Sequence, residues 1–184
     1  STTLLDDEGR VVSYDNDDLS AVVSLGYGDQ GELNSFSYGG LTTSLVYGAN
    51  GRVAEVTSPG GKTVHFSHDA DDLLVGLELP SGRAYNYTRD GNGRLTTTEM
   101  PNGDIYSVTY TPRGLSDSFT YPHGGTVGTT WTPDGEVEAV TLASGKVIQY
   151  DYDSGGRQLG VSAGDVDITM EWEGVGENLV GISR

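Results

Sequence analysis

The sequence contains no cysteine, which excludes a disulfide framework and zinc-finger sites. No apolar run approaches the roughly 18 residues that a membrane-spanning helix needs. Basic residues are scarce, 10 against 27 acidic ones, and the resulting net charge of −17 repels nucleic acid and anionic membranes. We therefore expect neither nucleic-acid binding nor membrane insertion. The opening residues also lack a signal-peptide pattern, so we expect any targeting signal to lie outside this sequence.

Turn-forming and strand-forming residues make up much of what is present. The chain of 184 residues has 28 glycines, 11 tyrosines and only two methionines. Val, Thr and Tyr favour strands, whereas Gly, Asn and Asp interrupt them with turns. This composition predicts a turn-rich, all-β protein.

An internal repeat of about 21 residues runs through the chain. Its reference points, which we call anchor positions, are Leu5, Tyr27, Tyr47, His68, Arg89, Tyr110, Trp131 and Tyr152. From Tyr47 onward each anchor follows the previous one by 21 residues, and the two earlier intervals are 22 and 20. About eight repeats therefore tile residues 1–184, which we expect to form a single domain or a segment of one, with the first and last repeats degenerate.

Two columns of glycine mark two turns in each repeat. Four residues after the anchor, in what we call the near turn, stand Gly9, Gly31, Gly51, Gly93, Gly114, Gly135 and Gly156, with Asp72 in the remaining repeat. Fourteen residues after the anchor, in the far turn, stand Gly61, Gly82, Gly103, Gly124 and Gly145. Glycine accepts the positive φ that tight turns require, and Asn-Gly or Pro-x-Gly favours hairpins. Two turns per repeat leave two strands of six to eight residues, so each repeat predicts one β-hairpin.

One face of the predicted sheet carries the aromatic residues. In the strand that returns to an anchor, large side chains alternate with polar ones, as at Tyr85, Tyr87 and at Ile148, Tyr150. This period of two predicts a half-buried strand, and we expect the aromatic face to pack as a core. Trp172 alone falls outside the aromatic columns. Apolar residues six positions after the anchor break the alternation, so we expect a bulge or a strand start there.

The chain resembles the YD-repeat or Rhs-repeat family. The family motif, Tyr-Asp-x-x-Gly-Arg-Leu followed by Pro-x-Gly and Tyr-x-Tyr-Asp, is matched by "RDGNGRL" at 89–95, "YDSGGRQ" at 152–158, "PNGDIYSVTY" at 101–110 and "SGKVIQYDYD" at 144–153. The resemblance covers essentially the whole chain. Departures are Asp72-Leu73 in place of Gly-Arg, Arg89 at an anchor, and Glu32, Leu115 and Glu136 in place of the motif arginine.

The resemblance implies a wide, twisted antiparallel sheet of tandem hairpins that spirals into a shell. A small open or self-closed variant is the alternative for a chain of this length. In the family, bacterial Rhs and insecticidal-toxin proteins enclose a toxic polypeptide, and teneurins use the shell within a cell-adhesion receptor. We expect no Rhs self-cleavage here, because the sequence has no Asp-Pro. The structural repeat residues are the glycines of both columns together with Tyr47, Tyr87, Tyr110, Trp131, Tyr150 and Tyr152.

Motifs with catalytic or metal-binding potential are weak. "GVSAG" at 160–164 has the spacing of a hydrolase nucleophile elbow, but His65, His68 and His123 all lie upstream. His65 and His68 are three residues apart, which places them on opposite faces of a strand. The acidic clusters at 15–18, 69–72 and 165–167 follow no known calcium motif. We expect no catalytic residues, no metal site and no cofactor.

These observations favour a non-catalytic β-scaffold of a secreted or surface protein. We expect it to act in encapsulation or adhesion, by associating with neighbouring repeats or other chains through sheet edges or surfaces. A carbohydrate-binding adhesin module with a glycan ligand is one alternative. A part of a polymorphic toxin whose effector lies outside this chain is another.

Overall fold

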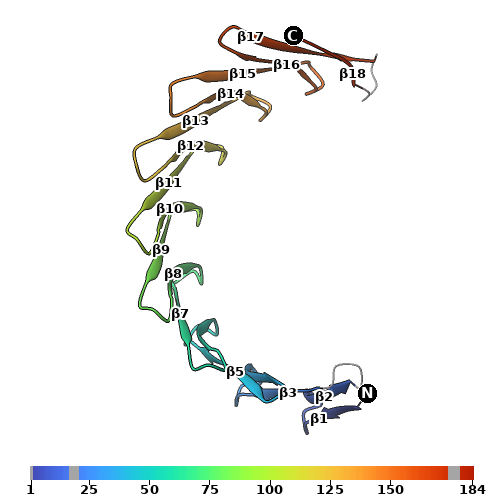
Figure 1. Ribbon diagram of the computed structural model, residues 1–184, viewed down its shortest axis with the longest axis vertical. Helices are drawn as coiled ribbons and strands as arrows, with labels where there is room; N and C mark the ends of the chain where they lie inside the picture. Colours follow the sequence, from blue (N-terminus) through green and yellow to red (C-terminus); the bar gives the residue numbers. More distant parts are fainter. Residues whose placement is uncertain (1, 17–20, 174–178) are drawn as a thin grey trace. The chain divides into compact units, whose positions relative to one another are not determined.

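The computed structural model describes residues 2–16, 21–173 and 179–184 (Figure 1). The chain divides into two compact units, residues 1–88 with 100–102 and residues 89–99 with 103–184. The described residues form 18 β-strands and no helix, so no helix long and apolar enough to cross a membrane occurs among them. The all-β prediction is confirmed.

The strands are short and evenly spaced along the chain. Those of the first unit are β1 (Thr2–Leu5), β2 (Val11–Asn16), β3 (Ala21–Tyr27), β4 (Leu33–Tyr38), β5 (Leu41–Tyr47), β6 (Val53–Thr57), β7 (Thr63–His68), β8 (Leu74–Glu78) and β9 (Ala84–Arg89). Those of the second unit are β10 (Leu95–Glu99), β11 (Ile105–Tyr110), β12 (Ser116–Thr120), β13 (Thr126–Trp131), β14 (Val137–Thr141), β15 (Val147–Tyr152), β16 (Gln158–Ala163), β17 (Val166–Trp172) and β18 (Leu179–Ser183).

Within each unit every strand pairs antiparallel with the next one in sequence. A bulge accompanies each near turn whose two strands lie in the same unit. At β11–β12, for example, Thr109 pairs with Ser118 and Tyr110 with Ser116, so Asp117 is the extra residue. Strands also start six residues after the anchor, as at Leu95 in β10. The bulge and the strand start expected at the apolar residue six positions after the anchor are both confirmed. The bulge shifts the alternation of the two faces by one residue.

The two faces of the strands differ in exposure as the alternation predicts. In β9, Tyr85 and Tyr87 are half-buried, whereas Asn86 and Thr88 are exposed. The expected packed core is nevertheless wrong, because no hydrophobic side chain among the described residues is fully buried. A single layer of strands covers each side chain from below and beside, and only a second layer would cover it from above.

Both turn columns have the backbone conformation that their glycines suggest. All seven near-turn glycines and all five far-turn glycines have positive φ. The near-turn position without glycine is Asp72, with a φ of 63°, and it is the one non-glycine residue with positive φ among the described residues. Asp tolerates this region better than most residues do.

The neighbouring glycines of one far turn allow a direct test of backbone strain. A Cβ at Gly60 or at Gly61 would meet nothing within 4 Å, but only Gly61 has positive φ, at 72°. We expect Gly61→Ala to lower the free energy of unfolding by about 1–2 kcal/mol, because an L side chain is strained there. Gly60→Ala, the matched control, should change it by less than about 0.5 kcal/mol or raise it slightly. Equal losses in urea unfolding would show that φ does not decide the cost.

Candidate functional site at the near turns

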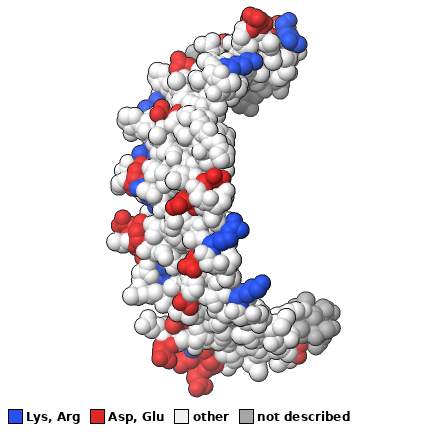
Figure 2. Space-filling view, turned by 60° about the vertical axis from the view of Figure 1, so that its left-hand side comes forward, with Lys and Arg blue, Asp and Glu red and all other residues white. Residues whose placement is uncertain are grey.

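Side chains of opposite charge lie near one another at several places in the view of Figure 2. The near turns contribute such a pair by a fixed geometry. In the turn after Arg89, the Arg94 backbone N–H donates to Asp90 Oδ1 at 3.1 Å and Arg94 Nε donates to Asp90 Oδ2 at 2.7 Å. Asp6 with Arg10 and Asp153 with Arg157 form the same pair. The Asp thus holds both the turn and its arginine.

These bonds stabilise the ionised form of the aspartates. The side-chain hydrogen bond from Arg94 holds the pKa of Asp90 below its ordinary value of 3.8. The pKa of Asp153 is also lowered. The largest cause is the hydrogen bond from the Arg157 backbone N–H, and the second is the hydrogen bond from the Arg157 side chain. Both carboxylates are therefore charged at neutral pH.

Five anchor aromatics each donate a hydrogen bond to the repeat before their own. The Tyr110 hydroxyl donates to the Leu95 carbonyl at 2.7 Å. The ladder between β10 and β11 ends at the pair Thr97–Ser107, so this bond spans the gap where the two strands part. Equivalent bonds run from Tyr27 to Val11, Tyr47 to Leu33, Trp131 to Ser116 and Trp172 to Gln158, at 2.7–2.9 Å. Tyr152 makes no such bond within the described chain.

The arginine of a near turn lies over the next anchor ring. The guanidinium carbon is 4.5 Å from the Tyr27 ring centroid for Arg10 and 4.4 Å from the Tyr110 centroid for Arg94. Arg157 lies 6.0 Å from the Trp172 centroid in the same way. Such cation–π contacts contribute about 0.5–1 kcal/mol each at exposed sites.

Trp172 is therefore a ninth anchor, and its exclusion from the aromatic columns is wrong. It follows Tyr152 by 20 residues, the interval that also separates Tyr27 from Tyr47. The shorter interval already visible between those two tyrosines was the signal that could have found it. The hydrogen bond to a carbonyl of the preceding repeat had no signal in the sequence.

Repeats that depart from the motif make other contacts at their near turns. Asp72 accepts a hydrogen bond from Asn50 Nδ2 at 2.8 Å and lies 3.7 Å from Arg52, so it joins its near turn to the preceding one. Arg89 donates to the Gly93 carbonyl at 3.2 Å. Arg113 donates to the Thr132 carbonyl at 3.1 Å and so reaches the following near turn.

The remaining candidates from the sequence do not converge. Ser162 lies inside β16, between partners in β15 and β17, and the next described element is β17 and not a helix, so Ser162 is not in the strand–turn–helix of a nucleophile elbow. His65 is exposed, 3.4 Å from Glu55, whereas His68 is half-buried opposite Leu74. His123 lies in the far turn between β12 and β13.

The acidic clusters likewise do not assemble. Part of the cluster at 15–18 lies outside the described residues. In the cluster at 69–72, Asp69 accepts hydrogen bonds from the backbone of its own turn. No group of three or more His, Asp or Glu residues that could hold a metal ion occurs in the described part of the chain.

The family model for the teneurin YD-shell matches residues 2–178. The chain belongs to the teneurin YD-shell family. No curated protein sequence matches it. Among solved structures, the YD-shell chain is similar to TcdB2-TccC3 without its hypervariable C-terminal region, with a TM-score of 0.71 and 16% identity over 98% of this chain. The Photorhabdus luminescens Tc holotoxin pore gives the same TM-score and identity over 99% of this chain. The present chain spans 11% of those chains, and at this identity the likeness shows a shared fold.

The hydrogen bond of the Tyr110 anchor can be tested by removing one atom. Tyr110→Phe keeps the ring under Arg94 but removes the donor to the Leu95 carbonyl. We expect a loss of about 1 kcal/mol in the free energy of unfolding, the usual net value of one hydrogen bond. The control is Tyr87→Phe, because the Tyr87 hydroxyl makes no side-chain hydrogen bond within the described chain. If both substitutions cost the same in urea, the anchor bond contributes nothing specific.

Stability should also depend on pH through the near-turn aspartates. Their folded-state pKa values lie below 3.8, so the unfolded chain binds more protons in acid and stability rises with pH there. The contribution is fully present above about pH 5 and is lost as the pH falls through the folded pKa. We expect the urea midpoint to fall over that range. Asp90→Asn combined with Asp153→Asn should flatten the profile, and an unchanged slope would contradict this origin.

Proposed function

We propose that this chain is a non-catalytic structural segment of a YD-shell, which acts by association with further repeats or other chains. The observation that carries the proposal is the anchor contact, repeated from one hairpin to the next in both units. This contact joins neighbouring repeats and does not form a binding or catalytic site. Continuous contact between repeats is what the wall of a shell requires. The family match supports the same conclusion. The glycines of both turn columns and the aromatics at or beside the anchors are the residues on which we propose that this role depends.

The half-buried aromatic face supports a role in encapsulation. Phe36 and Tyr38 in β4 and Tyr121 just after β12 are 42–48% exposed and have no covering layer among the described residues. Apolar surface of this kind favours contact with another polypeptide. We propose that this face lines the inside of a shell wall, and that the parent protein is secreted or displayed at a cell surface. An enclosed effector would lie outside the present chain.

A carbohydrate-binding role has less support. The aromatic cluster of the second unit is formed by Tyr106, Phe119 and Tyr121. Tyr121 meets Tyr106 at 70° and Phe119 at 76°, edge to face, so in each pair the edge of one ring points at the face of the other. A sugar-stacking platform needs an open ring face instead. Glycan binding is therefore one of the outcomes that the association experiment below can distinguish.

Association should involve the last strand. Among the described residues of its own unit, β18 pairs with β17 on one side and with no strand on the other, and it carries exposed Val180 (58%) and Ile182 (64%). Unpaired strand edges with apolar side chains favour pairing with another strand. We expect light scattering to show concentration-dependent association of the chain, and Val180→Lys with Ile182→Lys to abolish it.

The matched control places the same two charges away from that edge. Leu41→Lys with Val46→Lys changes exposed residues of β5, which is paired on both sides. Both variants make the net charge less negative by the same amount, so general repulsion cannot explain a difference between them. A strict monomer that binds a defined glycan saturably on an array would overturn the structural proposal in favour of the adhesin module.

A further inference from the structure

Several near turns place a guanidinium group at an equivalent position, over the anchor ring of the next repeat. Three repeats place an arginine there, between the near turn that holds it and the anchor ring of the next repeat. We call this position the guanidinium socket. In the repeat that begins at Trp131, Thr132 replaces the motif aspartate and Glu136 replaces the motif arginine. The socket before Tyr152 therefore has a carboxylate where its counterparts have a cation.

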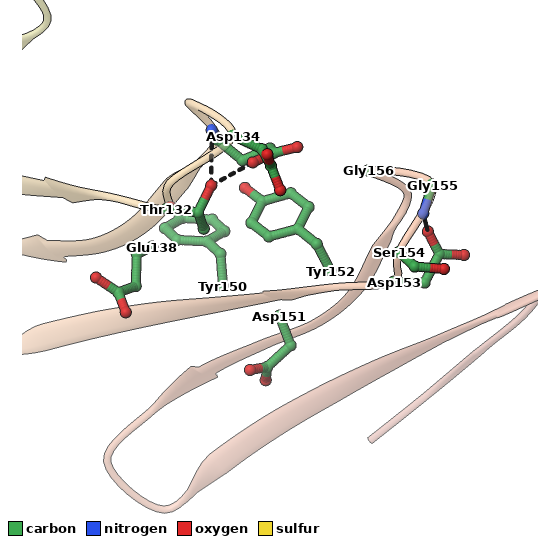
Figure 3. Close-up of a pocket in the computed structure, with 11 residues that line it drawn as sticks. Thr132, Asp134, Glu138, Tyr150, Asp151, Tyr152, Asp153, Ser154, Gly155 and Gly156 are labelled. Atoms are coloured by element: carbon green, nitrogen blue, oxygen red, sulfur yellow. Dashed lines mark hydrogen bonds between the residues drawn. The ribbon is translucent and has the colours of Figure 1, made fainter. Parts of the chain in front are cut away.

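A cavity of about 590 Å³ opens at this socket. It is lined by Thr132, Asp134, Glu136, Glu138 and residues 150–156, which include no Lys, Arg or His. Figure 3 shows the rings of Tyr150 and Tyr152 on one side of β15, next to Thr132, with Asp151 on the other side. The anchor ring is thus present and carboxylates surround it, but no arginine of the described residues lies over it.

The charge state of the socket suits a cation. Thr132 Oγ1 donates to Glu136 Oε2, and this bond lowers the pKa of Glu136, so the carboxylate is ionised at neutral pH. The pKa of the Tyr152 phenol is raised, mainly because the group is partly removed from solvent and secondly because Glu136 is negatively charged. The Tyr152 side chain therefore stays neutral. The nearest cation from the preceding turn, Arg113, is committed to the Thr132 carbonyl.

We propose that the socket at Glu136 and Tyr152 binds an arginine side chain of a partner protein. The partner's guanidinium would lie over the Tyr152 ring and pair with Glu136, as Arg94 lies over Tyr110 and pairs with Asp90. The net charge of the chain, −17, attracts a basic segment of a partner to its surface. Arginine fits better than lysine because its planar group both stacks and makes paired hydrogen bonds.

The other repeat with glutamate in place of arginine does not offer the same site. Like Glu136, Glu32 bonds within its own near turn, where its Oε2 accepts from the Gln30 backbone N–H at 3.1 Å, but the space beside the next anchor ring differs. The cavity beside Tyr47 is only about 220 Å³. The proposal is therefore confined to the socket at Tyr152.

The test uses the whole chain and a short acetylated, amidated peptide containing Arg-Gly-Arg, with a citrulline peptide of the same sequence as the neutral control. Backbone amide shifts in NMR report where each peptide binds. We expect the arginine peptide to shift amides of residues 132–136 and 152–156, and the citrulline peptide to leave them unchanged. Thr132→Asp combined with Glu136→Arg restores the motif pair and fills the socket from within. It should keep the fold and weaken peptide binding about tenfold, the effect expected for one ring contact with one ion pair.

The reciprocal variant tests gain instead of loss. Asp90→Thr combined with Arg94→Glu opens the socket at Tyr110, and we expect a second set of shifts around that ring. Three outcomes would overturn the proposal: equal shifts with the citrulline peptide, unchanged affinity in the filled variant, or shifts spread over all acidic turns alike. The last would indicate attraction by overall charge alone.

Discussion

The bond from an anchor aromatic to a carbonyl of the preceding repeat is the contact on which the rest of the fold depends. The two strands of a hairpin are paired near the far turn and part toward the near turn, where each takes a different partner. Without the Tyr110 hydroxyl, the Leu95 carbonyl would face an open gap beyond the last ladder pair. The ring fills that gap with apolar surface while its hydroxyl satisfies the backbone. Tyr and Trp are the side chains that offer both a large ring and a donor at its far end.

This contact explains how the protein keeps a regular structure although none of the described hydrophobic side chains is fully buried. Within each unit, neighbouring repeats are joined by strand pairing, five of the anchors add a bond to a carbonyl of the preceding repeat, and in three repeats a guanidinium lies over the ring. Stability in such a design is close to a sum of neighbour terms, as in other repeat proteins. The aromatic face is left half-exposed, and its burial requires another layer or another chain. A wall that encloses a polypeptide has this property, which links the local contact to the proposed role.

The fold was largely predictable from the sequence, whereas the contacts at the near turns were not. The 21-residue period, the glycine columns and the alternation around Tyr85 and Tyr87 predict hairpins, faces and bulges, because these follow from local backbone preferences. The packed core was mispredicted, since alternation reports which side is less exposed and not how many layers cover it. Trp172 was missed because a strict 21-residue count hides intervals of 20. The socket beside Tyr152, which holds no arginine from the described part of the chain, depends on which side chain of one turn reaches the ring of the next, and only coordinates show that.

The central claim is that neighbouring repeats are coupled through the anchor ring, and a double-mutant cycle between Arg94 and Tyr110 measures that coupling most directly. The free energy of unfolding in urea is compared for the parent chain, Arg94→Gln, Tyr110→Leu and the double variant. The account predicts a coupling energy of about 0.5–1 kcal/mol, because removing the ring also removes the contact of the guanidinium. Additive losses, with a coupling energy near zero, would contradict it.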